Sequence, residues 1–157
     1  MTDFDALISR LDASDEDTFW FGPAAEGAIS ELESLLGQQL PPTFREFLKR
    51  CGGGGVEESE VSGVYGEASK GDRGTVWGDT KRCRQDFGLP DHLVVVFFSG
   101  DEVCWCLDCS QTRDDGECPV VSYSVFDRKV DREIAEDFGT FFEDYVELRT
   151  QVFNETI

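Results

Sequence analysis

The apolar residues of this chain change from helix-like to strand-like spacing at the glycine run Gly52–Gly55. Before the run, apolar residues recur at intervals of three and four, which is typical of amphipathic helices. After it, short runs rich in Val, Phe and Tyr alternate with Gly, Asp and Pro, which is typical of strands joined by turns. Helices followed by consecutive strands predict an α+β fold with an antiparallel sheet.

Three helices are predicted before the glycine run. The first covers 4–11, and the second covers 25–36 and ends at Gly37, as expected for a glycine that follows a helix C-terminus. The third covers 41–51, with a proline pair in its first turn, and ends at Gly52. Because the glycine run follows a helix and lacks the Lys-Ser/Thr of a phosphate-binding loop, we interpret it as a helix end.

Four strands are predicted after the glycine run: Val61–Tyr65, Leu93–Phe98, Glu102–Leu107 and Val120–Val125. Short turns join consecutive runs as hairpins, so we expect one antiparallel sheet of about four to six strands. The segment 66–90 is predicted to be a loop with one or two helical turns.

The chain is predicted to close with a helix that packs on the sheet. Its apolar positions keep helical spacing and are Ile134, Phe138, Phe141, Phe142, Tyr145 and Leu148. Asp131 and Glu133 suit the start of this helix, because carboxylates interact favourably with a helix N-terminus. A length of 157 residues, without an internal repeat, fits one domain.

The charge balance is strongly acidic, with 33 acidic and 14 basic side chains and a formal net charge of −19. This excess repels phosphate backbones and anionic lipids, so we expect no direct nucleic-acid binding and no membrane association. Met1–Asp5 lacks the basic and apolar segments of a signal peptide, and the longest apolar run, Leu93–Phe98, is too short to span a bilayer. We expect a cytoplasmic protein, with a monomer as its simplest assembly.

No residue pattern points to catalysis. The single histidine, His92, falls in a predicted turn, and no nucleophile is paired with it, so we interpret it as an exposed loop residue. We expect no catalytic residue and no cofactor.

Four cysteines fall close together: Cys104, Cys106, Cys109 and Cys118. Four thiolates can hold a tetrahedral zinc ion, but only Cys106 and Cys109 have the C-x-x-C spacing. Cys104 and Cys106 alternate with apolar residues, as small core residues of a strand do, so we interpret the cysteines as structural and expect no metal. If the two flanking strands pair, Cys109 and Cys118 face one another and form a possible redox pair.

Two acidic clusters fall in predicted loops, where partner specificity is usually concentrated. They are Glu57, Glu58 and Glu60 after the glycine run, and Asp114, Asp115 and Glu117 before the last predicted strand. A net charge well beyond what solubility requires favours rapid capture of a basic protein. These six carboxylates are the candidate interface residues.

A set of core and turn residues follows a specific order along the chain. It consists of Glu33-x-x-Leu36-Gly37-x-x-Leu40-Pro41-x-x-Phe44-x-x-Phe47-Leu48 with Gly52-Gly53, Val61-x-Gly63-Val64-Tyr65, Gly88-Leu89-Pro90 with Leu93-Val94-Val95, Cys106-Leu107-Asp108, the segment 116–121, and Ile134-Ala135-x-x-Phe138-x-x-Phe141. In this order and spacing they resemble the SUKH superfamily, in its branch similar to yeast cell-wall-assembly regulators. The resemblance covers about 25–145 of a single domain, 1–157, and leaves 1–24 as an N-terminal helical extension.

The resemblance implies a SUKH-like α+β fold without catalysis, and cysteines without a metal at Cys106 and Cys118. Bacterial members are implied to be immunity proteins that neutralise toxin domains, often nucleases, of contact-dependent or polymorphic toxin systems. We therefore predict an immunity protein that occludes a basic cognate toxin domain stoichiometrically. The alternatives are an intracellular regulatory scaffold, as implied for fungal members, and a zinc or redox module built on the segment 104–118.

Overall fold

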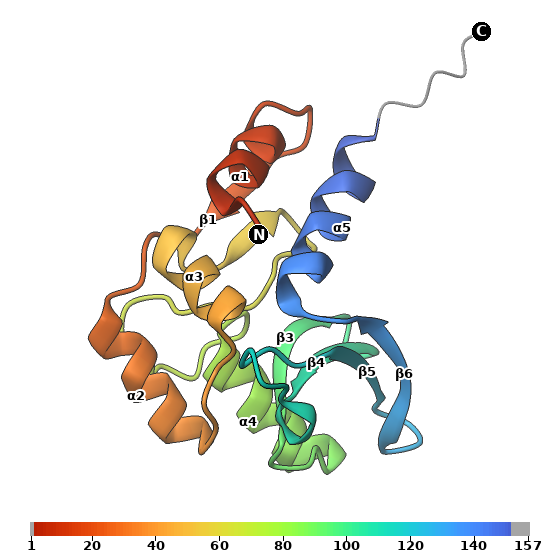
Figure 1. Cartoon of the computed structure of the whole chain (residues 1–157). Coiled ribbons are helices and arrows are strands. Elements are labelled where there is room, and N and C mark those ends of the chain that lie inside the picture. The colour runs from red at the N-terminus through yellow and green to blue at the C-terminus, as the bar shows by residue number, and fades with distance from the viewer. Residues whose placement is uncertain (1, 152–157) are drawn as a thin grey trace, which may run out of the picture.

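The computed structural model describes residues 2–151 as a single α+β domain (Figure 1). In chain order its elements are α1 (Phe4–Asp12), β1 (Thr18–Trp20), α2 (Glu26–Leu36), α3 (Pro42–Cys51), β2 (Gly54–Val56), α4 (Val76–Phe87), β3 (Leu93–Ser99), β4 (Val103–Asp108), the 3₁₀ turn η1 (Cys109–Gln111), β5 (Val120–Ser124), β6 (Lys129–Ala135) and α5 (Phe138–Thr150). The helices before the glycine run and the strands after it confirm the predicted fold class. None of the helices between residues 2 and 151 combines the length and apolarity that crossing a bilayer requires.

Strands β3, β4, β5 and β6 form a four-stranded antiparallel meander in that order. Three of the predicted strands correspond to β3, β4 and β5. The fourth, Val61–Tyr65, is not a regular strand, because its backbone hydrogen bonds are divided among different segments. Val61 exchanges hydrogen bonds with Gly54, whereas the amide of Ser62 donates to the carbonyl of Val96.

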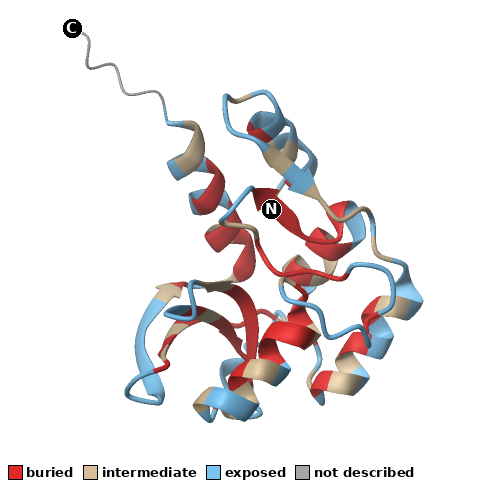
Figure 2. Ribbon diagram, turned by 180° about the vertical axis from the view of Figure 1, so that it is seen from behind, coloured by how far each residue is buried: buried red, intermediate tan, exposed pale blue. Residues whose placement is uncertain are grey.

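The predicted start of the closing helix is wrong. Asp131 and Glu133 lie on β6, the exposed edge strand of the meander (Figure 2), and the register pairs Val121 with Glu133. The helix α5 begins only after Asp137, whose carboxylate accepts a hydrogen bond from the amide of Thr140. Pairing with β5 therefore outweighs the helix-like spacing of the preceding residues.

The segment 66–90 contains a full helix, α4, where only a turn or two was predicted. Its buried face includes polar residues, so it lacks an apolar stripe in the sequence. Thr80 is fully buried, and its hydroxyl accepts a hydrogen bond from the amide of Val95 on β3. Thr75 caps the helix by accepting from the amide of Gly78.

The main core lies between the helices and one face of the sheet, as the buried residues in Figure 2 show. Phe4 of α1 packs within 6.3 Å, ring centre to ring centre, of Phe47, Phe138 and Phe142. The N-terminal helix therefore shares the core of α3 and α5. A second, smaller core lies between α4 and the sheet.

The glycine run ends α3 and also builds a strand. Gly52 adopts the left-handed conformation with φ of 76°, which confirms the predicted helix end. The following residues form β2, which pairs with β1 so closely that a Cβ atom on Gly54 would collide with the carbonyl oxygen of Phe19. This two-stranded sheet, β1–β2, was not predicted.

Candidate functional site

The β1–β2 pairing brings two carboxylate-rich loops together. The register places Thr18 at the start of β1 opposite Val56 at the end of β2. The loop before β1 and the loop after β2 therefore adjoin, and the amide of Glu57 donates to the carbonyl of Asp17 across 2.9 Å. The exposed carboxylates of these loops are Asp15, Glu16, Asp17, Glu57 and Glu58, with the half-buried Glu60 behind them.

Three aromatic side chains lie on and near β1, which directly follows the first of these loops. Phe19 and Phe21, two positions apart on the same side of the chain, pack with ring centres 5.8 Å apart, and Tyr65 meets Phe21 edge-on at 5.5 Å. Phe19 and Tyr65 are 47% and 51% exposed, although both are large aromatic residues. We call the surface formed by these three rings, Asp15–Asp17 and Glu57–Glu60 the acidic–aromatic face. Exposed aromatic groups of this kind commonly anchor protein interfaces.

Helix α5 holds the acidic loop after β2 in place. The hydroxyl of Tyr145 accepts a hydrogen bond from the amide of Val56 at 2.9 Å and donates one to the carbonyl of Ser59 at 2.7 Å. Arg149 stacks on the Tyr145 ring at 3.7 Å, and its Nε donates to the Ser59 hydroxyl. Burial raises the pKa of Tyr145, which keeps its phenol protonated and able to donate. The loop is thus fixed by contacts at two of its residues.

A cavity of about 320 Å³ lies beside the same loop. Glu58 and Glu60 line it, together with Arg73, Asp79 and the end of β3. Asp79 is only 3% exposed, and its carboxylate accepts hydrogen bonds from the Ser62 hydroxyl at 2.7 Å and the Gly74 amide at 3.1 Å. Burial raises the pKa of Asp79. Because acidic groups outnumber the single arginine, the cavity suits a basic side chain of a partner.

The second predicted acidic cluster does not join the acidic–aromatic face. Asp114 and Asp115 are exposed, but Glu117 is only 7% exposed and is not a free loop carboxylate. Its two oxygens accept hydrogen bonds from the amide and the hydroxyl of Thr43 at the start of α3, at 2.9 and 2.8 Å. The candidate interface residue Glu117 is therefore held against the start of α3 and is not available at the surface. The two clusters lie at opposite ends of α3, because the glycine run follows its C-terminus.

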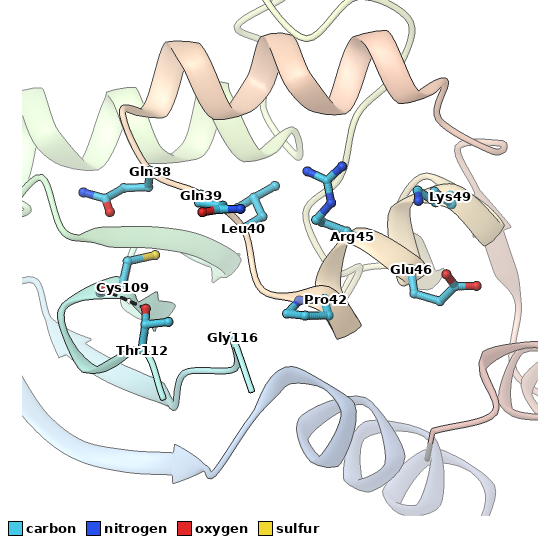
Figure 3. Close-up of a pocket in the computed structure, with 10 residues that line it drawn as sticks. All are labelled: Gln38, Gln39, Leu40, Pro42, Arg45, Glu46, Lys49, Cys109, Thr112 and Gly116. Atoms are coloured by element: carbon cyan, nitrogen blue, oxygen red, sulfur yellow. Dashed lines mark hydrogen bonds between the residues drawn. The ribbon is translucent and has the colours of Figure 1, made fainter. Parts of the chain in front are cut away.

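A larger cavity, about 530 Å³, lies between the α2–α3 connection, α3 and the β4–β5 loop (Figure 3). Two cations line it, Arg45 and Lys49, which are unusual in so acidic a chain. Both are already paired: Arg45 with Glu26 and Glu33, and Lys49 with Glu26 at 3.1 Å. These ion pairs join α2 to α3, so both cationic side chains that line the cavity among the described residues are already paired.

The four neighbouring cysteines separate into two places. Cys104 and Cys106 lie in the smaller core with Cys83, at sulfur–sulfur distances of 3.9 Å for Cys83–Cys104 and 3.7 Å for Cys104–Cys106. Cys109 and Cys118 interact with each other beside the larger cavity. Within residues 2–151, His, Cys, Asp and Glu side chains form no group of three or more with the arrangement of a metal site.

His92 is half-buried, whereas the sequence predicted an exposed position. Its carbonyl accepts a hydrogen bond from the amide of Cys109 at 2.8 Å, so the turn that carries it packs against η1. The residues that sequence reasoning missed are Asp15–Asp17, Phe19 and Tyr65. No sequence pattern indicated an exposed ring at Phe19, and the β1–β2 register places it opposite Gly55, two residues before Glu57.

A comparison with known families gives an independent result. Residues 4–147 match the model of the SUKH_5 family, which is described as SMI1-KNR4 cell-wall. The match starts at the beginning of α1 and ends within α5, so it includes the segment 4–24 that the resemblance had left outside. All strands and both loops of the acidic–aromatic face lie within this range, and the chain belongs to the SUKH_5 family of SMI1-KNR4 proteins.

Proposed function

We propose that this protein is an immunity protein, which binds a basic toxin domain and neutralises it by one-to-one occlusion. SUKH proteins are commonly immunity proteins of polymorphic toxin systems and are generally non-catalytic. The observation that carries the proposal is the acidic–aromatic face, which combines exposed rings on and near β1 with carboxylates from two loops that meet at Asp17 and Glu57.

The net charge and the aromatic rings contribute to partner binding at different distances. A net charge of −19 attracts a basic partner over several ångströms of solvent and raises the association rate. At contact, burial of Phe19 and Tyr65 removes apolar area from water, which slows dissociation. The loop Glu57–Glu60 is already fixed by Tyr145, so little conformational entropy is lost when a partner binds it.

A nuclease toxin offers a fitting counterpart, because its substrate groove must be positive to hold phosphates. Carboxylates from Asp15–Asp17 and Glu57–Glu60 present several negative charges from adjoining loops, as a nucleic-acid backbone does. The cavity beside Glu58 and Glu60 has room for one lysine or arginine side chain of the toxin. The proposed mechanism is therefore physical obstruction of the toxin's groove.

Growth rescue tests the proposal directly. The C-terminal domain encoded by the reading frame immediately upstream is expressed in a sensitive host, with and without this protein. We expect the domain to arrest growth and the intact protein to restore it. The double variant Glu57→Gln/Glu58→Gln should rescue poorly, whereas Asp131→Asn/Glu133→Gln, with the same charge change on β6, should rescue fully.

The outcomes separate the candidate surfaces and functions. Loss of rescue in the variant Asp114→Asn/Asp115→Asn would instead place the interface at the β4–β5 loop. Full rescue by both the Glu57/Glu58 variant and the Asp114/Asp115 variant would support the immunity function but reject both proposed surfaces. Growth arrest without rescue would favour a regulatory scaffold, the second candidate, because the matched family is described by a cell-wall association.

A further inference from the structure

Cys109 and Cys118 lie just beyond the paired ends of strands β4 and β5. The register of β4 and β5 pairs Leu107 with Val120, and the amide of Asp108 donates to the carbonyl of Pro119 at 2.9 Å. If this register is extended by one residue past each strand end, Cys109, the first residue of η1, comes opposite Cys118. Opposing residues of antiparallel strands have Cβ atoms about 4.5–5.5 Å apart, and closest in pairs that exchange no backbone hydrogen bond. A disulfide needs only a small approach from there.

The two thiols differ in access to solvent. Cys109 is half-buried and lines the larger cavity, with its sulfur pointing toward the α2–α3 connection in Figure 3. Cys118 is 1% exposed. A small oxidant that enters the cavity therefore meets Cys109 first.

The surroundings of Cys109 favour its thiolate. A hydrogen bond with the Cys118 thiol lowers the pKa of Cys109, and the guanidinium of Arg84 acts in the same direction, against burial and the charge of Asp108. Arg84 is fixed there by hydrogen bonds to the carbonyls of Leu36 and Asp91. The pKa of Cys118 is raised by its hydrogen bond with Cys109 and by burial. Cys118 is thus the weaker initial nucleophile.

We propose that Cys109 is a peroxide-reactive thiol and that Cys118 resolves its oxidised form, which gives a reversible intrachain disulfide. In the first step the Cys109 thiolate attacks one oxygen of hydrogen peroxide; the S–O bond forms, the O–O bond breaks, and the departing hydroxide takes a proton to become water. In the second step the Cys118 sulfur gives up its proton and attacks the Cys109 sulfenic acid. The S–S bond forms, and the hydroxide leaves as water with that proton. Two thiols and one peroxide thus become one disulfide and two waters.

The second thiol cluster provides an internal control. The sulfur of Cys104 lies 3.9 Å from that of Cys83 and 3.7 Å from that of Cys106, and all three residues are 0% exposed. Their proximity would permit oxidation, but an oxidant has no access to them in the folded protein. Access, and not proximity alone, is expected to select the pair that reacts.

Peptide mapping of the whole reduced protein after one equivalent of hydrogen peroxide tests the proposal. Free thiols are alkylated, and trypsin is applied without reductant. Cleavage after Arg84, Arg113 and Arg128 leaves Cys118 in the peptide 114–128, whereas Cys104, Cys106 and Cys109 share 85–113. We expect the intact protein to lose two hydrogens and these two peptides to be linked, with the link removed by dithiothreitol.

Three variants assign the two roles. Cys118→Ser should stop at the sulfenic acid, which dimedone traps on Cys109, and Cys118→Ala provides the same test if the serine is not tolerated in the core. Cys109→Ser should abolish the link, whereas Cys83→Ala should leave it unchanged. A link that persists in Cys109→Ser, or a first disulfide that includes Cys83, would overturn the proposal. None of these measurements requires a partner, so their outcome is independent of the proposed immunity function.

Discussion

The hydroxyl of Tyr145 occupies the space in which a side chain at Gly55 would begin. A Cβ atom at Gly55 would overlap the phenolic oxygen, and the backbone there has φ of 136°. The same hydroxyl binds the amide of Val56 and the carbonyl of Ser59. The last glycine of the run is thus the residue that lets α5 reach the acidic loop of the acidic–aromatic face.

Replacing this glycine should be costly. Gly55→Ala combines a positive φ with overlap against Tyr145, so we expect a loss of about 2 kcal/mol or more in the free energy of unfolding. Gly100→Ala is the matched control, because Gly100 also has a positive φ, of 60°, but no atom within 4 Å of its would-be Cβ. Urea unfolding measures both, and equal losses would show that the overlap with Tyr145 is unimportant.

Removing the hydroxyl should loosen the acidic loop. Tyr145→Phe leaves the amide of Val56 and the carbonyl of Ser59 without their partner, and we expect a loss of about 1–3 kcal/mol. Hydrogen exchange at Val56 should accelerate more than exchange in β4. Tyr65→Phe is the control, because that side chain is half exposed. Gly55→Ala should also cost less in the Tyr145→Phe background, and strictly additive losses would contradict the contact.

The sequence predicted the parts of the fold that local chemistry decides. Glycines mark the ends of α2 and α3, and continuous apolar runs mark β3 and β5. Helix α4 was underestimated because its buried face carries polar residues, including Asp79 and Thr80, whose hydrogen-bond partners come from distant segments. Strand β6 was mistaken for a helix start because its pairing with β5 is not encoded in its own residues.

The candidate site, like the fold, was predicted from the sequence only in part. Glu57 and Glu58 were assigned to a loop, and both are exposed after β2, but the contact of Glu57 with Asp17 depends on the β1–β2 register. Such register involves residues far apart in the sequence and leaves no periodic signal. Glu117 was misjudged because its partner, Thr43, lies on another element.

The contribution of Asp79 to the free energy of unfolding should fall as pH rises. Burial raises its pKa above the ordinary value of 3.8, against hydrogen bonds from Ser62 and Gly74 and the charges of Arg73 and Arg82. The folded state therefore holds the proton more tightly than the unfolded state, and stability declines from pH 3.8 upward until the raised pKa is passed.

Asp79→Asn isolates this contribution, because the other titrating groups are common to both proteins. The variant should gain stability relative to the wild type as pH rises from about 4 to 7. Denaturant unfolding across that range measures the difference. A difference that stays constant, or that grows toward acid, would contradict the assignment.

Charge and aromatic contact should affect different rate constants of toxin binding. With the C-terminal domain of the upstream gene product as the immobilised partner, Glu57→Gln/Glu58→Gln should lower the association rate and weaken its dependence on salt. Phe19→Ala should mainly accelerate dissociation, by a factor of about 10 or more if the ring is buried at the centre of the interface. Phe126→Ala is the matched control, because Phe126 is 78% exposed in the turn between β5 and β6, at the other end of the molecule (Figure 1). Equal effects of Phe19→Ala and Phe126→Ala would place the interface elsewhere, since only a ring that is buried on binding can hold the partner in place.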